Sequence, residues 1–232
     1  MNHELRYCAS RSVNRIDTEF LYQGLHELPD RLNRSLKEAL KSVEADKYEY
    51  ILLNYGLCGN GTLDIGHPEL PIIVYSFHDC IPLLIGDRKF HADYLKERPG
   101  TFWYSCGWIE GFPLPGGPDY AEKYSEFYNR KINEKQRDVI EAMLMQNYTH
   151  LVFIRWDELG GKVAELGREY TKRCAWSLSS RLGREFVYDE VKGSPEILKR
   201  FVDGEWDGDE FLCVEPGKVL KFDYSKNRLY SE

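Results

Sequence analysis

Two apolar runs in the first third of the chain constrain the fold most. The run "LPIIVYSF" covers residues 70–77 and is rich in β-branched residues, and "YEYILLNYG" covers residues 48–56. Short continuous runs of this kind are typical of strands in sheets that are covered on both faces. Neither run approaches the roughly 20 apolar residues that a membrane-spanning helix needs. We therefore expect a buried sheet and no membrane partner.

Helical patterns alternate with these runs along the chain. Leu28, Leu32, Leu36, Leu40 and Val43 recur every three or four residues, and the charged segment 118–147 also has apolar residues at helical spacing. This alternation predicts an α/β fold, a mainly parallel sheet with helices on both faces, and a long helical segment at 118–147. Further strands are expected at "ELRYCAS", "TFWYS" (101–105), "HLVFIRW" (150–156) and "EFVYDEV", and a closing strand or hairpin at "EFLCVEPGKVLKF".

Length and charge restrict the classes of function. The 232 residues suffice for one α/β domain, with 1–115 and 116–232 as candidate sub-lobes. The net charge is −7 and no basic block is present, so nucleic acid is not expected as a partner. The start "MNHELRYCASR" lacks the apolar core of a secretory signal. We expect a cytoplasmic protein of unspecified oligomeric state.

The cysteines are scattered, as in proteins of reducing compartments, where thiols serve packing, metal binding or catalysis. Cys8 ends the first strand candidate, Cys58 follows the second by a few residues, and Cys80 follows the third. Parallel strands end at one edge of their sheet, so these three thiols are predicted to converge there as metal ligands. Cys106 also follows a strand candidate and could be a fourth ligand. The remaining two, Cys174 and Cys213, fall in apolar patterns and are expected to fill core volume.

The stretch "HDC" supplies the next candidates. Asp79 suits the N-cap of a helix, and Cys80 would then feel the positive end of the helix dipole, which favours the thiolate. His78 is predicted to be a metal ligand or a proton carrier. The alternative is a hydrogen-bonded histidine of the core.

The loop "NYGLCGNGT" places a cysteine among three glycines directly after a buried strand. Gly56, Gly59, Asn60 and Gly61 would let the backbone approach a bound group closely, and Arg88 could hold its carboxylate or phosphate. The alternative is a tight turn whose cysteine only packs. A second loop, "CGWIEGFPLPGGPD", has the composition of a lid, and Glu110 within it could act as an acid or base.

The segments "YGLCGNG", "HDC", "LLIGDR" and "PGTFWYSCGWIEG" together resemble the prokaryotic family catalogued as domain of unknown function 1638. The resemblance covers Cys8 to about Gly111 well and the C-terminal half loosely. It implies that Cys8, Cys58, His78 and Cys80 form one shared pattern, whereas Cys106 departs from it. The family has no settled activity. Some members occur beside genes for corrinoid methyltransferases, which implies a corrinoid, or a corrinoid protein, as a candidate cofactor or partner.

Three kinds of function remain open. The first is a zinc or iron–sulfur site at the sheet edge, acting on a small carbonyl or carboxyl substrate or in corrinoid methyl transfer. The second is an amidase or acyl-transfer enzyme with Cys58 as nucleophile, although no histidine follows residue 150 to pair with it. The third is a binding module for an anionic or corrinoid ligand, without chemistry of its own.

Overall fold

The computed structural model describes residues 1–76, 79–226 and 228–232, without the side chains of His26 and Cys58. The contacts divide the chain into two compact units. Unit 1 comprises Met1–Arg11 and Ile81–Leu198, and unit 2 comprises Ser12–Cys80 and Lys199–Glu232. These boundaries differ from the division at residue 115, and the prediction that the chain forms one domain stays a prediction.

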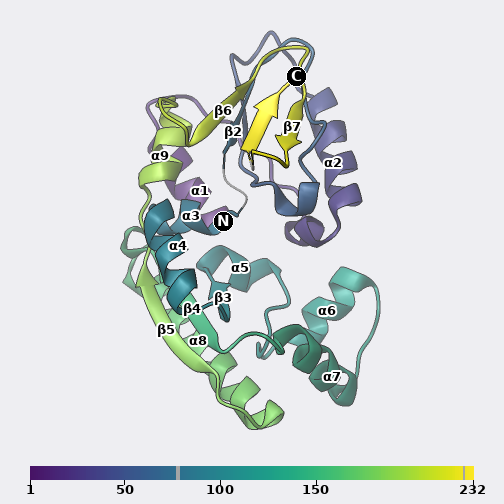
Figure 1. Cartoon of the computed structure of the whole chain (residues 1–232), viewed down its shortest axis with the longest axis vertical. Coiled ribbons are helices and arrows are strands. Elements are labelled where there is room, and N and C mark those ends of the chain that lie inside the picture. Colours follow the sequence, from purple (N-terminus) through teal and green to yellow (C-terminus); the bar gives the residue numbers. More distant parts are fainter. Residues whose placement is uncertain (77–78, 227) are drawn as a thin grey trace. The chain divides into compact units, whose positions relative to one another are not determined.

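Unit 1 is built on a three-stranded sheet, sheet B. Its strands are β3 (Thr101–Tyr104), β4 (His150–Arg155) and β5 (Val187–Lys192), in the order β3-β4-β5 (Figure 1). Both pairings are parallel, with Thr101 beside His150 and His150 beside Val187. The strands expected at 101–105, 150–156 and "EFVYDEV" are confirmed.

Helices cover both faces of sheet B. Helix α8 (Gly161–Leu182) lies against β4 and β5 (Figure 1), and Gly167 packs onto the ring of Phe153. The opposite face meets helix α4 (Arg88–Glu97), whose Tyr94 donates a hydrogen bond to Asp189 Oδ2 at 2.6 Å. Alternate side chains of a strand point to opposite faces of the sheet, so the same strands can contact α8 on one face and α4 on the other. The α/β class with helices on both faces of a parallel sheet is confirmed.

The other helices of unit 1 are α1 (Asn2–Ala9), α3 (Ile81–Ile85), α5 (Cys106–Gly111), α6 (Tyr120–Tyr128), α7 (Glu134–Met145) and the 3-10 helix η3 (Asp157–Leu159). The strand expected at "ELRYCAS" is wrong, since this segment is α1. Its buried residues, Glu4 and Cys8, are four apart and so lie on one side of a helix. That spacing does not fit the two-residue alternation of a strand.

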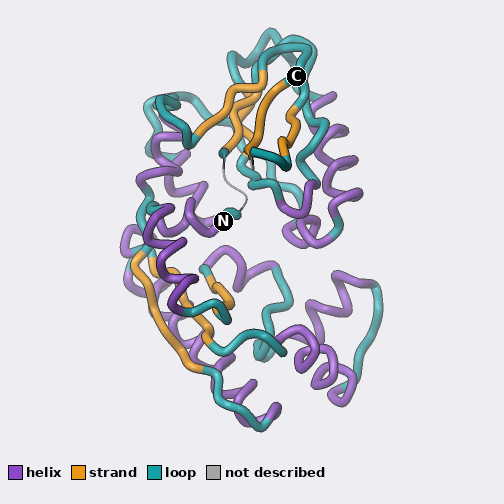
Figure 2. Tube along the Cα trace, in the orientation of Figure 1, coloured by secondary structure: helices purple, strands orange, loops and turns teal. Residues whose placement is uncertain are grey.

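The segment 118–147 forms two helices, α6 and α7, separated by a loop (Figure 2). Asn129 ends α6 in the left-handed conformation, with φ 49°. Asn133 and Gln136 then start α7 with a reciprocal capping box. The segment 118–147 is therefore helical, as expected, but a polar loop at its centre divides it into two helices.

The glycine- and proline-rich loop that follows α5 is anchored to unit 1. Gly116 donates its backbone N–H to the buried Glu141 at 2.6 Å, and Tyr104 donates its hydroxyl to the Pro115 carbonyl at 2.7 Å. Tyr170 of α8 donates to Asp119 at 2.8 Å. The lid predicted from composition is thus partly helix, in α5, and partly a turn held by buried hydrogen bonds.

Unit 2 contains sheet A, ordered β1-β2-β6, and the hairpin β7-β8. The strands are β1 (Ile51–Leu53), β2 (Ile72–Tyr75), β6 (Phe211–Val214), β7 (Leu220–Asp223) and β8 (Arg228–Ser231). Strands β1 and β2 are parallel, whereas β2–β6 and β7–β8 are antiparallel. Of the five pairings in the described residues, three are parallel, as a mainly parallel fold requires.

Sheet A is also covered on both faces. Helix α2 (Pro29–Lys41) buries Leu32, Leu36 and Leu40 against one face, which confirms the helix read from the leucine spacing. On the other face, Tyr75 packs against Phe201 of α9 (Glu196–Asp203), with ring centroids 4.3 Å apart. Two 3-10 helices, η1 (Gln23–Glu27) and η2 (Cys58–Asn60), complete unit 2.

Candidate functional site

The parallel strands β1 and β2 bring two cysteine-bearing segments to one edge of sheet A. The strands pair in register from Ile51 and Ile72 onward. Cys58 follows the end of β1 by five residues, and Cys80 follows the end of β2 by five. Neighbouring strands are about 4.8 Å apart, so these two segments start side by side. Ligands of parallel α/β sheets bind beyond this carboxyl edge.

The glycine loop after β1 packs closely against the start of α2. Gly59 and Asn60 have positive φ angles of 64° and 73°, so the chain turns sharply there. A Cβ atom added to Gly61 would lie 2.8 Å from Leu32 Cδ2 and 3.3 Å from the Pro29 Cα atom. Glycine at position 61 is therefore explained by packing against a helix. This matches the alternative reading of a tight turn.

Hydrogen bonds close the same loop. Thr62 donates its hydroxyl to the Gly56 carbonyl at 3.3 Å, and Asn33 of α2 donates to the Gly61 carbonyl at 3.1 Å. The Asn60 amide lies 3.2 Å from the Tyr224 hydroxyl and donates to it. All of these contacts are within unit 2. That Gly56, Gly59, Asn60 and Gly61 approach a cofactor stays a prediction.

The four predicted metal ligands have different outcomes. Cys8 lies in helix α1 of unit 1 and is buried, so the argument that it ends a strand is wrong. Cys80 is half-buried and directly precedes α3. His78 and the side chain of Cys58 lie outside the described residues. Within residues 1–76, 79–226 and 228–232, no three His, Cys, Asp or Glu side chains are close enough to share a metal ion.

Cys106, the candidate fourth ligand, is held as a buried thiol. It begins α5 directly after β3 and Ser105, and its sulfur lies 3.8 Å from the Val163 carbonyl. Burial, reinforced by the Glu4 carboxylate, raises the pKa of the Cys106 thiol to about 12. A metal ligand or nucleophile needs the thiolate. The surroundings of Cys106 therefore favour packing over ligation.

Glu110 and Arg88 lie on exposed helical positions of unit 1. Glu110 is in α5, and its Oε1 atom lies 2.9 Å from His3 Nε2. Arg88 is the first residue of α4, next to the N-cap Asp87, whose side chain accepts the Phe90 N–H at 2.9 Å. The acid–base role predicted for Glu110 and the anion-binding role predicted for Arg88 stay predictions.

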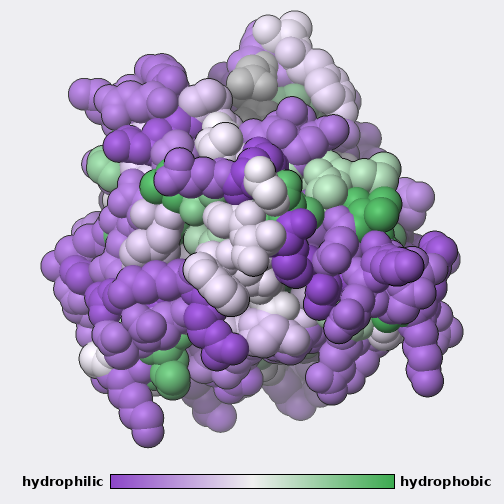
Figure 3. Space-filling model, turned by 90° about the horizontal axis from the view of Figure 1, so that it is seen from below, coloured by the Kyte–Doolittle hydropathy of each residue, from purple (hydrophilic) through white to green (hydrophobic). Residues whose placement is uncertain are grey.

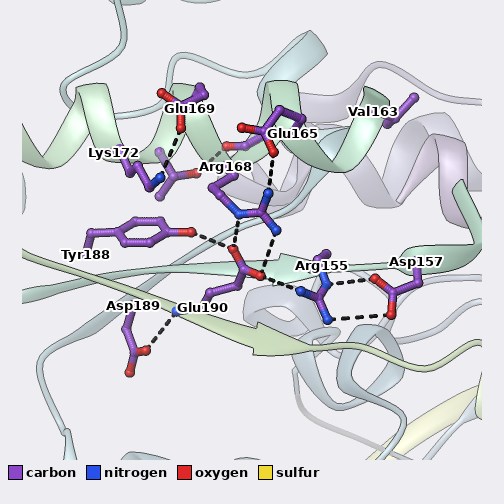
Figure 4. Close-up of polar contacts among 12 residues, drawn as sticks. Arg155, Asp157, Val163, Glu165, Arg168, Glu169, Lys172, Tyr188, Asp189 and Glu190 are labelled. Carbon is purple, nitrogen blue, oxygen red and sulfur yellow. Dashed lines mark hydrogen bonds and ion pairs between the residues drawn. The ribbon is translucent and has the colours of Figure 1, made fainter. Parts of the chain in front are cut away.

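A dense polar cluster lies between α8 and the end of sheet B (Figure 4). Glu190 of β5 accepts two hydrogen bonds from Arg168, at 2.7 and 3.1 Å, and one from Arg155 at 2.9 Å. The Tyr188 hydroxyl donates a fourth at 2.7 Å. Hydrogen bonding from Arg168 is the main reason why the pKa of Glu190 falls to about 2. The carboxylate is saturated with donors.

Sequence reasoning missed this cluster. Tyr188 and Glu190 alternate with Asp189 in "EFVYDEV", and the alternation could have assigned Glu190 to the face of the sheet that α8 covers. An acidic residue at such a position requires a cationic partner. The partner, Arg168, is 22 residues away in the chain, and nothing in the local pattern identifies it.

These features define a mixed α/β protein. In sheet A, strand β1 leads into a loop that carries a cysteine, and in sheet B the Glu190 carboxylate is neutralised by arginines of the same unit. The chain belongs to the family described as "Protein of unknown function (DUF1638)", whose model matches residues 20–201. The resemblance to that family is confirmed. The match includes positions 58, 78 and 80 but not position 8, and it extends well beyond Gly111 into the second half of the chain.

No curated protein and no solved structure matches the chain. In the part of the chain that the structure describes, no helix combines the length and the apolar character required to span a bilayer.

Proposed function

We propose that this protein binds a metal ion or an iron–sulfur cluster at the carboxyl edge of β1 and β2, through Cys58 and Cys80, with His78 as a further ligand or proton carrier. The observation that carries the proposal is the parallel pairing of β1 and β2, which starts both cysteine segments at the same edge. A reducing, cytoplasmic setting is part of the proposal, because thiolate ligands require reduced cysteines.

The ligand set suggests what the centre could do. Two thiolates and one imidazole match a zinc site that keeps one position open for water or substrate. An iron–sulfur cluster usually takes more thiolates than these two. In either case the open position could bind a small carbonyl or carboxyl compound, or serve methyl transfer with a corrinoid partner.

The test is elemental analysis with an absorption spectrum on protein purified without oxygen. Iron with charge-transfer bands would select a cluster, and zinc without such bands would select the mononuclear site. Cys58→Ser and Cys80→Ser are each expected to lower the affinity for the metal by more than about tenfold, and so to lower the metal content that remains after dialysis against a chelator, because even the loss of an outer-shell partner costs about 10- to 100-fold in affinity. His78→Ala should lower it less if the histidine only carries a proton.

The matched control is Cys213→Ser. Cys213 lies in the same sheet, on β6 opposite Ile73, but within a strand rather than beyond its end. Its variant should keep the full metal content. Metal content that is equal in wild type, Cys58→Ser and Cys80→Ser would show the proposal to be wrong.

A further inference from the structure

Helix α7 has its charged side buried. Glu141 is fully buried, accepts the Gly116 N–H at 2.6 Å and lies 2.5 Å from Arg181 Nη1 of α8. Met145, one turn later, is also buried. A buried carboxylate that loses its partners is strongly unfavourable, so these contacts fix the rotation of α7 about its axis.

The opposite side of α7 is apolar and exposed. At about 100° per residue, Val139 and Met143 lie roughly 160° from Glu141 in opposite directions around the helix. The exposed fractions of their side chains are 59% and 69%. An ordinary surface helix turns its apolar stripe to the core. Here the Glu141 contacts prevent that rotation, so the stripe faces outward.

Beside this stripe, α6 and α7 enclose an open groove of about 380 Å³. Its apolar walls are Tyr124, Ile132, Val139 and Ile140, and its cationic residues include Arg130 and Lys135. We refer to these six residues as the α6/α7 groove. On the face of the molecule drawn in Figure 3, hydrophobic residues likewise interrupt a mostly hydrophilic surface. Large exposed apolar patches with a polar rim are typical of interaction sites.

The charged residues that line the groove are all cationic, in a chain of net charge −7. Arg130 and Lys135 line it, and Lys131 lies in the same loop. None of these three forms an ion pair with any residue that the structure describes. The groove therefore offers cationic groups to an anionic partner.

We propose that the α6/α7 groove binds an amphipathic helix of a partner protein that carries acidic residues beside its apolar stripe. Helices bind in apolar grooves through side chains spaced at i, i+3, i+4 and i+7. The apolar stripe would contact Val139 and Ile140, and the flanking carboxylates would meet Arg130 and Lys135. A concave groove fits a cylindrical helix better than the flat surface of a bilayer.

The test uses synthetic helical peptides of about four turns, labelled with fluorescein, with leucines at i, i+3, i+4 and i+7. One peptide carries glutamates beside the leucines and the other carries lysines. Fluorescence anisotropy should show the glutamate peptide binding about tenfold more tightly than the lysine peptide, with the difference shrinking at high salt. The double variant Arg130→Glu/Lys135→Glu should reverse this preference. Val139→Glu should weaken the binding of both peptides.

The matched control is Trp176→Glu on α8, because Trp176 is 74% exposed but lies outside the groove. It should bind both peptides like wild type. Four outcomes would overturn the proposal: no binding of either peptide, equal affinity for the two, self-association of the protein that Val139→Glu abolishes, or binding to vesicles of anionic phospholipid that Val139→Glu abolishes. The third would identify a second copy of the chain as the occupant, and the fourth a membrane surface.

Discussion

The two parallel sheet edges of this protein differ in how their functional groups are used. Near the carboxyl end of sheet B in unit 1, on the face that α8 covers, Glu190 is saturated by Arg168, Arg155 and Tyr188. At the end of β1 in unit 2, residues 54–62 include no Asp, Glu, Lys, Arg or His, and the loop that bears Cys58 is fixed by turns and packing instead. A carboxyl edge alone therefore does not identify a site. The better candidate for a functional site is the edge of sheet A, where no ion-pair network occupies the loop of residues 54–62.

The largest expected effect comes from removing the Glu190 carboxylate from the polar cluster of sheet B. Glu190→Ala leaves Arg168 and Arg155 without their shared carboxylate in a partly buried place, which should lower the free energy of unfolding by about 3 kcal/mol. Urea denaturation followed by circular dichroism measures it. Metal content should not change, because this edge is structural.

The control for that variant is Glu165→Ala. Glu165 is an exposed partner of the same Arg168, so its loss should change stability by less than about 1 kcal/mol. If the two variants were equally stable, the cluster around Glu190 would contribute no more than an ordinary surface ion pair. The contrast between the two edges would then lose its energetic basis.

Acid should weaken the same edge. The pKa of Glu190 is lowered from 4.5 to about 2 in the folded protein, so the folded state favours the carboxylate. The resulting stabilisation is complete above pH 4.5 and is lost as the pH falls toward 2, with a total of about 3 kcal/mol. Unfolding free energies measured across this range should fall less steeply in Glu190→Gln than in wild type. If the unfolding free energy fell equally steeply with pH in both proteins, Glu190 would not be the group whose protonation weakens this cluster.

Gly193, which follows β5 directly, tests how tightly this edge is packed. A Cβ atom there would meet the ring of Trp156 and the Leu84 carbonyl oxygen, and these two groups are already joined by a 2.7 Å hydrogen bond. Because neither group can move easily, Gly193→Ala should lower the unfolding free energy by about 2 kcal/mol. The control is Gly161→Ala, at which an added Cβ meets nothing within 4 Å. Thermal unfolding should separate the two variants clearly.

Much of the fold follows from local patterns in the sequence. The leucine spacing of α2 and the apolar runs of β1, β2 and β4 are strong periodic signals, and the elements lie where these signals predict. The segment "ELRYCAS" was misassigned because seven residues with one interrupting arginine fit a strand or a helix equally well. Its helical form depends on burying Glu4 and Cys8 together, which is a tertiary effect.

The candidate site was predictable only in part. The neighbouring parallel strands that precede Cys58 and Cys80 could be inferred from adjacent apolar runs. That Cys8 lies in a helix of unit 1 could not, because its place depends on the misassigned first element. The glycines of the loop signalled close approach correctly, but sequence could not say that one partner of that approach is Leu32 of α2. Long-range packing of this kind leaves no local pattern.

The smallest expected effect belongs to Gly61→Ala, which separates packing from ligand binding at the sheet A edge. The new methyl group would press on Leu32 Cδ2 at 2.8 Å, the end of a side chain that can shift slightly within its buried surroundings. We therefore expect a loss of about 1 kcal/mol in unfolding free energy, less than for Gly193→Ala, where rigid groups oppose the methyl. Because that methyl points at α2, the metal content of Gly61→Ala should equal that of wild type. A variant that kept wild-type stability but lost its metal would show that Gly61 makes room for the bound centre, and the packing explanation of this glycine would be wrong.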